Sequence, residues 1–470
     1  MSYSYSTSVN TPEPTLAVGD NKVPYELTSS RLPKPIPTSS RILSIPASNG
    51  SSQAPGGLIT FQLPNGSGAG YLKSQSSFVR FKMNVAGSTG GWSFGGSTNS
   101  CAGIANRLTI SLGGTQLEQI TNYNFYHNMI LDHTCDGSYL SSSANILEGC
   151  LANGTNVNPN GVAVSEATAL LTAPANGCFQ AFNVNTTYDF VLPLCSGILQ
   201  NPKSYPLFLS NAPLTIQLDV NQLAVAVKPD AVVAGGAGTL TSFTISNPEF
   251  VYEAQYVSPE MEMSIKSVMA QTGKLYEMPV STAMGLQTSV AQNAGLSYNI
   301  GVNLSSINAV LWGQVSTADL GSTGTGYFTK LETQDSSVNR RLFLDGKQVV
   351  SYNITSDALQ YAELRRCVGA LWDTQVNPRV STQVRQYDNI GNAPTAANGN
   401  YANTYGGISF VAGNNCRRFH SDDLCFAGTS ANQITLLLDR TTSSAGNVYI
   451  YVIYDQILVW DAMGQVAIAK

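Results

Sequence analysis

Charged residues are scarce in this sequence. Only 11 % of its 470 residues are Asp, Glu, Lys or Arg, far below the roughly 25 % of an average soluble protein. Hydrophobic residues make up 43 %, so the shortage of charge does not reflect the composition of a disordered chain. The surface must consist largely of neutral polar residues, whereas a free monomer ordinarily carries more charge for solubility. The composition therefore indicates a protein that is packed against copies of itself.

The sequence also lacks the signals of a nucleic-acid or membrane partner. Its net charge is −5, and the N-terminal stretch holds nearly equal numbers of acidic and basic residues, so it provides no basic arm for phosphates. No apolar run is long enough to span a membrane. The start, Met1-Ser2-Tyr3, is polar and lacks the charged and apolar regions of a signal peptide. We expect a chain that is made and used in the cytosol or nucleus, without sequence-specific nucleic-acid binding.

Metal-binding residues are few and poorly spaced. The sequence has 3 histidines and 8 cysteines. His133-Thr134-Cys135 and the segment from His420 to Cys425 contain ligand types, but neither has the paired spacing of a structural zinc site. No CxxC pair occurs, so the cysteines are expected to be reduced and mostly buried. The sequence predicts neither a metal nor a cofactor.

Catalytic patterns are equally sparse. No Gly-x-Ser-x-Gly segment joins a strand to a helix. The glycine-rich residues 66–70 lack the Lys-Ser/Thr ending of a phosphate loop, and a turn is the better interpretation. Four carboxylates could in principle form the acid/base pair of a glycosidase, but nothing in the sequence brings two of them together: Glu118, Asp189, Glu332 and Asp345. We therefore predict no catalytic residue and no enzyme.

What the sequence does contain is a long β pattern behind an N-terminal arm. Residues 1–55 are rich in Pro and Ser, which predicts an extended arm that is either disordered or ordered along a neighbouring subunit. Apolar and polar residues then alternate as in half-buried strands. These strands are expected at residues 58–63, 77–83, 188–192, 214–220, 296–300, 307–315, 433–439 and 448–459, with a further pair of strands near 240–257. Residues 134–178 have the composition of a long surface loop.

Two stretches of the chain share one design. Residues 106–118 and 339–349 both begin with Asn-Arg, continue as a short apolar strand and turn at glycine into a second strand. Both are followed by a helix-like segment. The first carries Phe125, Tyr126, Met129 and Ile130 on one face, with Asn122 as its expected cap. The second covers residues 357–367. The same order of elements used twice predicts two β-sandwiches of about 200 residues each.

The predicted fold class is all-β, with two consecutive jelly-roll β-sandwiches and short helices in the connections between strands. Ser258-Pro259-Glu260 has the residues of a helix start, so a short helix over residues 261–269 is expected to close the first sandwich. The expected divisions are an arm over 1–55, a first jelly roll over 56–257, a connecting helix and linker over 258–274, and a second jelly roll over 275–470.

The order of these segments resembles the double jelly-roll major capsid proteins of icosahedral double-stranded DNA viruses. It is most similar to those of Polinton-like viruses and virophages, within the lineage of adenovirus hexon and the large algal-virus capsid proteins. The resemblance covers about residues 58–470, and three segments carry it: 107–124 with its helix, 190–199 leading to 212–218, and 248–252 running into 258–259. It implies homotrimeric, pseudo-hexagonal capsomers that tile a virion shell with minor capsid and penton proteins. Whether a membrane lies beneath the shell stays open.

Some aromatic residues are expected in the core of the protein, and one is a candidate for contact with another subunit. Tyr123, Phe125 and Tyr126 are expected in a helix core. Trp92, flanked by glycines, is a candidate subunit contact.

The leading hypothesis from the sequence is a capsid subunit without enzymatic activity that assembles inside the host cell. The first alternative is a carbohydrate-binding or receptor-binding β-sandwich protein, such as a fibre or lectin. The second alternative is a glycan-cleaving enzyme.

Overall fold

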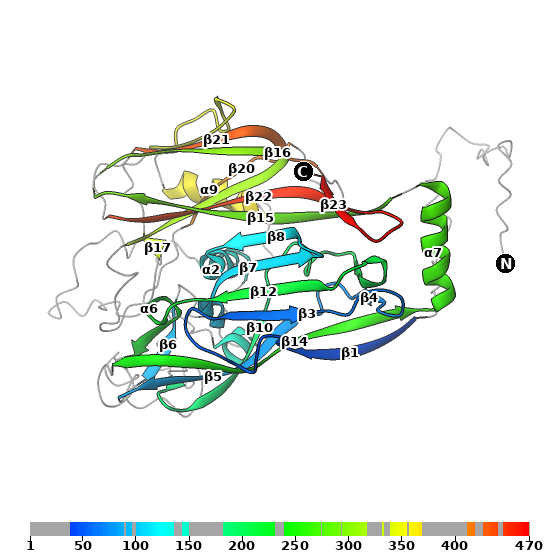
Figure 1. Ribbon diagram of the computed structural model, residues 1–470. Coiled ribbons are helices and arrows are strands. Elements are labelled where there is room, and N and C mark those ends of the chain that lie inside the picture. Colours follow the sequence, from blue (N-terminus) through cyan, green and yellow to red (C-terminus); the bar gives the residue numbers. More distant parts are fainter. Residues whose placement is uncertain are drawn as a thin grey trace, which may run out of the picture. The chain divides into compact units, whose positions relative to one another are not determined.

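The helix α7 (Pro259–Thr272) separates the strands into two sets that share no sheet among the described residues (Figure 1). The computed structural model describes residues 38–88, 91–95, 100–135, 143–149, 182–230, 239–273, 275–292, 294–316, 331–332, 339–354, 357–368, 411–418, 426–439 and 445–469. Residues 39–470 form one compact unit. No helix in these ranges is long and apolar enough to cross a membrane.

Among the described residues, the first set holds fourteen strands and five short helical segments. The strands are β1 (Thr38–Pro46), β2 (Ser52–Gln53), β3 (Leu58–Gln62), β4 (Tyr71–Leu72), β5 (Phe78–Gly87), β6 (Gly91–Phe94), β7 (Ala105–Leu112), β8 (Thr115–Thr121), β9 (Phe182–Asn183), β10 (Thr187–Pro193), β11 (Tyr205–Pro206), β12 (Leu214–Val220), β13 (Val227–Asp230) and β14 (Leu240–Val257). The helical segments are η1 (Cys101–Ile104), α2 (Tyr123–Thr134), α4 (Ser143–Glu148), η2 (Leu207–Leu209) and α6 (Leu223–Ala226).

The second set holds nine strands and one helix in the described part of the chain. They are β15 (Tyr276–Val290), β16 (Leu296–Ser316), β17 (Leu331–Glu332), β18 (Asn339–Leu344), β19 (Lys347–Gln348), β20 (Ala412–Asn415), β21 (Thr429–Asp439), β22 (Gly446–Trp460), β23 (Val466–Ala469) and α9 (Asp357–Val368).

Strand order is the same in the two sets. In the first, β3-β12-β7-β8 forms one sheet, and β14-β5-β10 forms the other, with β1 and β2 on the far edge of β14. In the second, the long strand β16 takes part in both layers: its first half gives the order β16-β21-β18-β19, and its second half gives β15-β22-β16-β20. Each set is therefore a jelly roll, and the predicted pair of consecutive jelly-roll sandwiches is confirmed.

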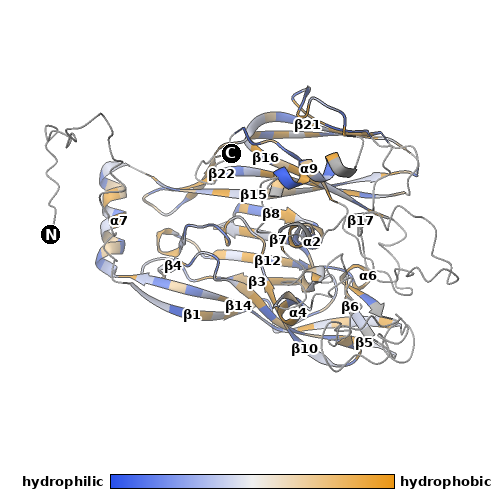
Figure 2. Cartoon of the chain, turned by 180° about the vertical axis from the view of Figure 1, so that it is seen from behind, coloured by the Kyte–Doolittle hydropathy of each residue, from blue (hydrophilic) through white to orange (hydrophobic). Residues whose placement is uncertain are grey.

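The sandwich cores follow from alternation along the strands. In β5 and β12 every second residue is buried, as expected when one sheet face packs on a core. Phe61 of β3 and Phe250 of β14 meet between the two layers of the first jelly roll, with ring centroids 5.9 Å apart. Figure 2 shows the hydrophobic residues along the strands of both jelly rolls. Burying one such side chain stabilises the fold by about 1.5–3 kcal/mol.

Both predicted hairpins are present and turn in the same way. Gly113 and Gly114 have φ of 56° and 89°, and Asp345 and Gly346 have φ of 47° and 77°. Positive φ at both central residues is the requirement of a type I′ turn, which fits the twist of paired strands. Glycine, and to a lesser degree aspartate, tolerates this conformation.

The Asn-Arg motifs that precede the hairpins are not structurally equivalent. Counted back from the turns, Arg340 takes the place of buried Leu108 and is itself buried, where it donates to Gln360 Oε1 at 2.9 Å. Arg107 instead lies at the surface and pairs with Asp219 at 2.6 Å. In both jelly rolls the Asp partner lies on the strand that pairs with the first strand of the hairpin. Asp219 is on β12, and Asp439 of β21 pairs with Arg341 at 2.9 Å.

Two helices differ from expectation at their ends. Asn122 precedes α2 in the left-handed conformation with φ of 51° and makes no side-chain cap, so the predicted Asn122 cap is wrong. Ser258 caps α7 by accepting from the Met261 N–H at 3.3 Å, with Pro259 at the first position. The helix runs on to Thr272, beyond the expected residue 269, and ends where Gly273 takes φ of 63°.

Part of the expected N-terminal arm is β-strand, and residues 1–37 of it lie outside the described residues. Residues 38–53, which we placed in the arm, form β1 and β2 and pair with β14. Ser44 Oγ donates to Glu249 Oε2 at 2.8 Å, which ties β1 to that strand. Proline at position 46 ends β1 without disturbing it, because proline is tolerated at the edge of a sheet. The expected loop over 134–178 contains α4; its residues 136–142 and 150–178 lie outside the described residues.

Candidate functional site: the seam between the two jelly rolls

The two jelly rolls of the chain meet along the edges of their sheets. β8 is the outer strand of its sheet, β15 is the outer strand of its own, and the two lie against each other (Figure 1). Thr121 Oγ1 donates to the Gly285 carbonyl at 2.6 Å, and Gln456 Nε2 donates to the Leu117 carbonyl at 2.8 Å. We call this contact the seam; it comprises β8, α2 and residues 195–201 of the first jelly roll, with β15 and β22 of the second. It covers two strand edges that would otherwise invite pairing with other chains.

Aromatic residues form the apolar part of the seam. The ring of Phe125 on α2 stacks on Tyr449 of β22 with a centroid distance of 4.1 Å, and Tyr126 lies 5.2 Å from Tyr451. Tyr451 also donates its hydroxyl to the Asn122 carbonyl at 2.7 Å. Burial raises the pKa of Tyr449 to about 12, so it stays neutral at physiological pH. The expected core position of the α2 aromatics is confirmed, and the core they join spans both jelly rolls.

A buried carboxylate lies at the centre of the seam. Glu118 of β8 is 2 % exposed and accepts from the hydroxyl of Ser196, the Gly197 N–H at 2.8 Å and the Thr282 hydroxyl of β15 at 2.6 Å. Burial raises the pKa of Glu118, and the hydrogen bonds that it accepts oppose this only in part. One acid surrounded by donors binds two lobes together; it does not make the acid/base pair of a glycosidase, which needs a second carboxylate.

Backbone contact at the seam is too close for ordinary side chains. A Cβ atom on Gly197 would lie 2.0 Å from the Ser281 carbonyl oxygen, and one on Gly285 would lie 2.3 Å from the Thr121 carbonyl oxygen. Asn201 reaches across as well, and its Nδ2 donates to the Pro279 carbonyl at 2.6 Å. Glycine at these two positions lets the backbones of the two jelly rolls touch. The relative placement of the two lobes is thereby fixed by backbone and side chains together.

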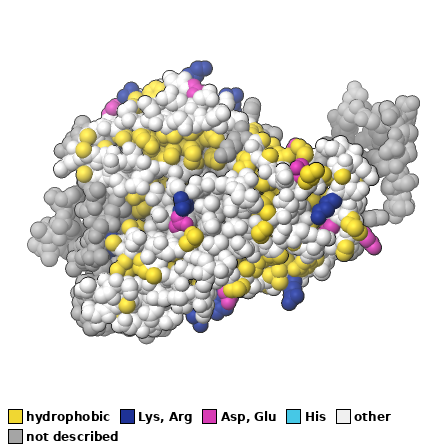
Figure 3. Space-filling view, in the orientation of Figure 1, with side chains coloured by type: hydrophobic (Ala, Val, Ile, Leu, Met, Phe, Trp, Pro, Cys, Tyr) yellow, Lys and Arg dark blue, Asp and Glu magenta, His cyan; other side chains and the backbone are white. Residues whose placement is uncertain are grey.

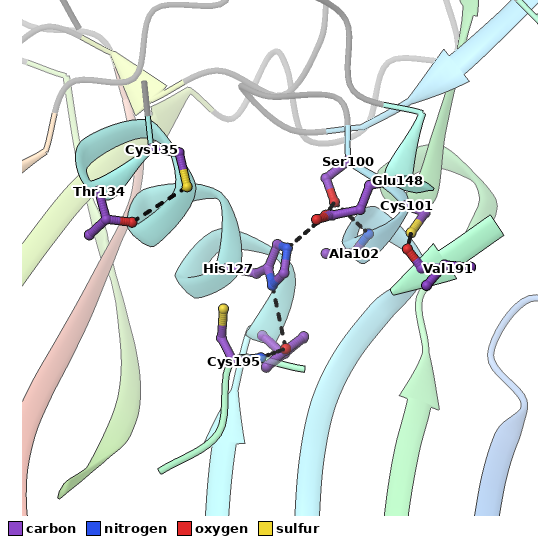
Figure 4. A network of polar contacts seen from close by, with 10 residues as sticks. Ser100, Cys101, Ala102, His127, Thr134, Cys135, Glu148, Val191 and Cys195 are labelled. Carbon is purple, nitrogen blue, oxygen red and sulfur yellow. Dashed lines mark hydrogen bonds and ion pairs between the residues drawn. The ribbon is translucent and has the colours of Figure 1, made fainter. Parts of the chain in front are cut away.

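A second buried network lies behind α2 (Figure 4). His127 points at Glu148 of α4, with Nε2 and Oε2 2.9 Å apart, and Ser100 donates to the same carboxylate oxygen. On its other side, His127 Nδ1 lies 3.4 Å from the Tyr123 hydroxyl, which accepts from the Cys195 N–H at 2.6 Å. Burial alone would lower the pKa of His127, but the Cys195 thiol and the Glu148 carboxylate outweigh it and raise the pKa to about 10.

This histidine predicts a pH dependence of stability. Because the pKa of His127 rises from 6.5 to about 10 on folding, the folded chain keeps a proton that the unfolded chain loses between these values. The stabilisation is fully present below pH 6.5 and is lost as the pH rises through about 10. Urea unfolding across this range should show a steeper fall in the free energy of unfolding for the wild type than for His127→Gln. Parallel pH profiles for the two proteins would contradict the assignment.

The other residues considered for catalysis lie apart and serve local structure. Asp189 is exposed on β10 and faces Arg80 at 3.7 Å. Asp345, in the turn of the second hairpin, accepts from the backbone N–H groups of Asn432 and Gln433 of β21, both at 2.9 Å. The side chains of Glu332 and His133, and the whole of His420, lie outside the described residues.

The glycine-rich segment 66–70 is a turn, as predicted. It holds a carboxylate of the chain itself: the Gly68 N–H and the Ser67 hydroxyl contact Glu262 Oε2 at 2.9 Å and 3.3 Å. The segment thus joins the start of α7 to the first jelly roll. In the part of the chain that the structure describes, no three His, Cys, Asp or Glu side chains gather where they could hold a metal ion.

Trp92 is not a surface contact, and that prediction is wrong. It lies in β6 with 0 % exposure, and its ring packs on Phe182 at 4.7 Å and Phe94 at 5.1 Å. Its Nε1 donates to the Asn183 carbonyl at 3.2 Å. The neighbouring glycines suggested a loop, but Gly95 serves close packing, since a Cβ there would lie 2.0 Å from the Val225 carbonyl oxygen.

Sequence reasoning missed most of the seam. No sequence motif marks Thr282, Gly285 or Gln456. The need for glycine at position 197 becomes visible only in the structure, where Ser281 lies against it. One usable signal was overlooked: residues 214–219 and 434–439 share an apolar alternation that ends in Leu-Asp. These are the equivalent strands β12 and β21, which pair with β7 and β18, and their alignment gives the register of the repeat.

The topology and the seam define the class: this chain is a double jelly-roll protein. No protein-family model and no curated protein matches it. Solved structures do. PBCV-1 VP54, fitted into a reconstruction of the virophage Sputnik, matches with a TM-score of 0.56 at 12 % identity, over 92 % of this chain and 97 % of that one. The Sputnik virophage structure gives 0.55 at 14 %, over 98 % and 92 %.

The mavirus major capsid protein matches in the same way, with a TM-score of 0.51 at 13 % identity, over 98 % of this chain and 97 % of that one. Agreement over nearly the whole length of both chains leaves no large part of the fold unmatched. The resemblance to double jelly-roll major capsid proteins is thus confirmed at the level of the fold.

Proposed function

We propose that this chain is a major capsid protein whose trimers form pseudo-hexagonal capsomers of an icosahedral shell. The observation that carries the proposal is the seam, which joins two jelly rolls of equal strand order into one pair. Three such pairs around a threefold axis place six similar lobes in a ring. A ring of six lobes packs against identical rings in a closed surface, which is what a shell requires.

The surface supports assembly. Figure 3 shows charged side chains only in small, scattered groups on the face in view, among broad neutral and hydrophobic areas. Surfaces of this kind suit extensive hydrogen-bonded contacts that retain water. They also account for the 11 % charged residues of the sequence, because buried contact surface needs little charge for solubility.

Three finer points belong to the same proposal. The subunit is structural and not an enzyme, with Glu118, Asp189 and Asp345 each engaged in holding the fold. Its partners are two further copies of itself, then neighbouring capsomers with minor capsid and penton proteins, in virions assembled inside the host cell. α7 marks the division between the jelly rolls.

Size and shape in solution test the proposal. Light scattering after size-exclusion chromatography should give three chain masses at micromolar concentration, and negative-stain class averages should show a pseudo-hexagonal outline. A monomer at that concentration would overturn the proposal. Binding of a glycan array by such a monomer would favour the carbohydrate-binding alternative.

A further inference from the structure

The first jelly roll has an uncovered edge where the second has a covered one. β1 lies beside β14, the last strand of its jelly roll, as β15 lies beside β22. β15 is covered by β8 across the seam, whereas β1 pairs only with β14 among the described residues. None of the nine residues of β1 is buried, and Ile42 is 73 % exposed. A long exposed edge with an apolar side chain is a site for pairing with another chain.

The second jelly roll is exposed at the position that β8 occupies in the first. In the first, the hairpin strand β8 pairs with β7 along its whole length and is covered by β15. Its counterpart β19 is only two residues long, and the chain then departs from the sheet until Ile354 bridges to Arg340. Residues 351–353 in this departure are exposed, with Tyr352 at 39 %.

We propose that β1 of one copy packs against the second hairpin, residues 339–354, of the neighbouring copy. The inference rests on the proposed trimer and follows from the repeat within the chain. The seam joins the hairpin side of jelly roll one to the first-strand side of jelly roll two. If the same contact is repeated between chains, the hairpin side of jelly roll two in one copy lies against the first-strand side of jelly roll one in the next copy. Three seams within chains then alternate with three contacts between chains, and the ring closes.

The seam within the chain and the contact proposed between chains differ in composition, as a contact formed during folding differs from one formed between folded subunits. The seam within the chain centres on buried Glu118 and stacked aromatic rings, which suits surfaces that fold together. The surfaces proposed to meet between chains carry exposed Arg41 and Ile42 on β1, and exposed Lys347 and Tyr352 on the second hairpin. Polar residues around an apolar contact are typical of an interface between subunits that fold before they associate. Ile42 and Tyr352 supply the apolar and aromatic area at its centre.

A matched pair of charge substitutions tests the surface in the full-length chain. Ile42→Lys should convert the trimer into monomer at micromolar concentration, because it places a charge in the contact. Met463→Lys is the control: Met463 is 79 % exposed but lies in the turn between β22 and β23, outside both surfaces. Both side chains are exposed, so neither change should alter the thermal unfolding of the chain. A trimeric Ile42→Lys, or equal loss of trimer in both variants, would overturn the inference.

Crosslinking identifies the partner surface independently. With p-benzoylphenylalanine in place of Ile42, illumination of the trimer should yield covalent dimers and trimers on a denaturing gel, with the crosslink mapped to residues 339–354. Crosslinks from a proper trimer to any other region would overturn the inference and leave the proposed function standing. A wild-type chain that never forms trimers would overturn the proposed function itself.

Discussion

A Gly197→Ala chain should unfold at markedly lower denaturant concentration than the wild type, and Gly197→Val should fail to hold its two jelly rolls together. Even the Cβ of alanine would lie 2.0 Å from the Ser281 carbonyl oxygen and 2.8 Å from its carbonyl carbon. The obstructing atoms belong to the backbone of β15, so no side chain can rotate away. Such overpacking costs about 1–3 kcal/mol and sometimes more, and the branched valine increases it.

The measurement is urea unfolding of purified chains, followed by light scattering for the trimer. Gly285→Ala should behave like Gly197→Ala, because its Cβ would lie 2.3 Å from the Thr121 carbonyl oxygen on the opposite side of the seam. Gly301→Ala is the control, since a Cβ there meets nothing within 4 Å. If Gly197→Ala unfolded at the same urea concentration as Gly301→Ala, the lobes would not be in the backbone contact described.

Local features of the fold were predictable because their causes are local. The turns at Gly113-Gly114 and Asp345-Gly346 are predictable because their residues tolerate positive φ. The alternation of apolar and polar residues predicts the strands around them. Ser258-Pro259 marks the start of α7 for the same reason. The fold class then followed from the order of such segments along the chain.

Contacts between distant segments were not predictable in this way. Trp92 looked like a loop residue because its partners Phe182 and Phe190 lie far along the chain, and strands distant in sequence, β9, β10 and β13, bring the groups that bury it. Glu118 was recognised as a carboxylate of interest, yet its donors Ser196 and Thr282 come from two other segments. A sequence shows which groups need partners, and the tertiary fold decides which partners they receive.

Replacing Glu118 should weaken the seam from its centre. Glu118→Ala leaves the hydroxyls of Ser196 and Thr282 and the N–H of Gly197 without their buried acceptor. Leaving a buried donor without its acceptor costs about 1–3 kcal/mol, because the remaining group stays desolvated and unpaired. Glu118→Gln keeps one acceptor oxygen and the shape of the side chain, so it should lose less. Urea unfolding of the two variants measures both losses on one scale.

A double-mutant cycle decides whether Glu118 acts across the seam or only within its own jelly roll. Thr282 is 3 % exposed and is the contact of Glu118 from the second jelly roll, at 2.6 Å. Groups in one hydrogen-bond network couple by about 0.5–3 kcal/mol, whereas independent sites are additive. We therefore expect Glu118→Ala with Thr282→Val to cost clearly less than the sum of the single changes. Glu118→Ala with Thr435→Val, a change on an exposed hydroxyl that bonds Asn299 at 2.7 Å, should be additive. Additivity in both cycles would mean that the carboxylate stabilises only the first jelly roll, and that the other contacts of the seam join the lobes.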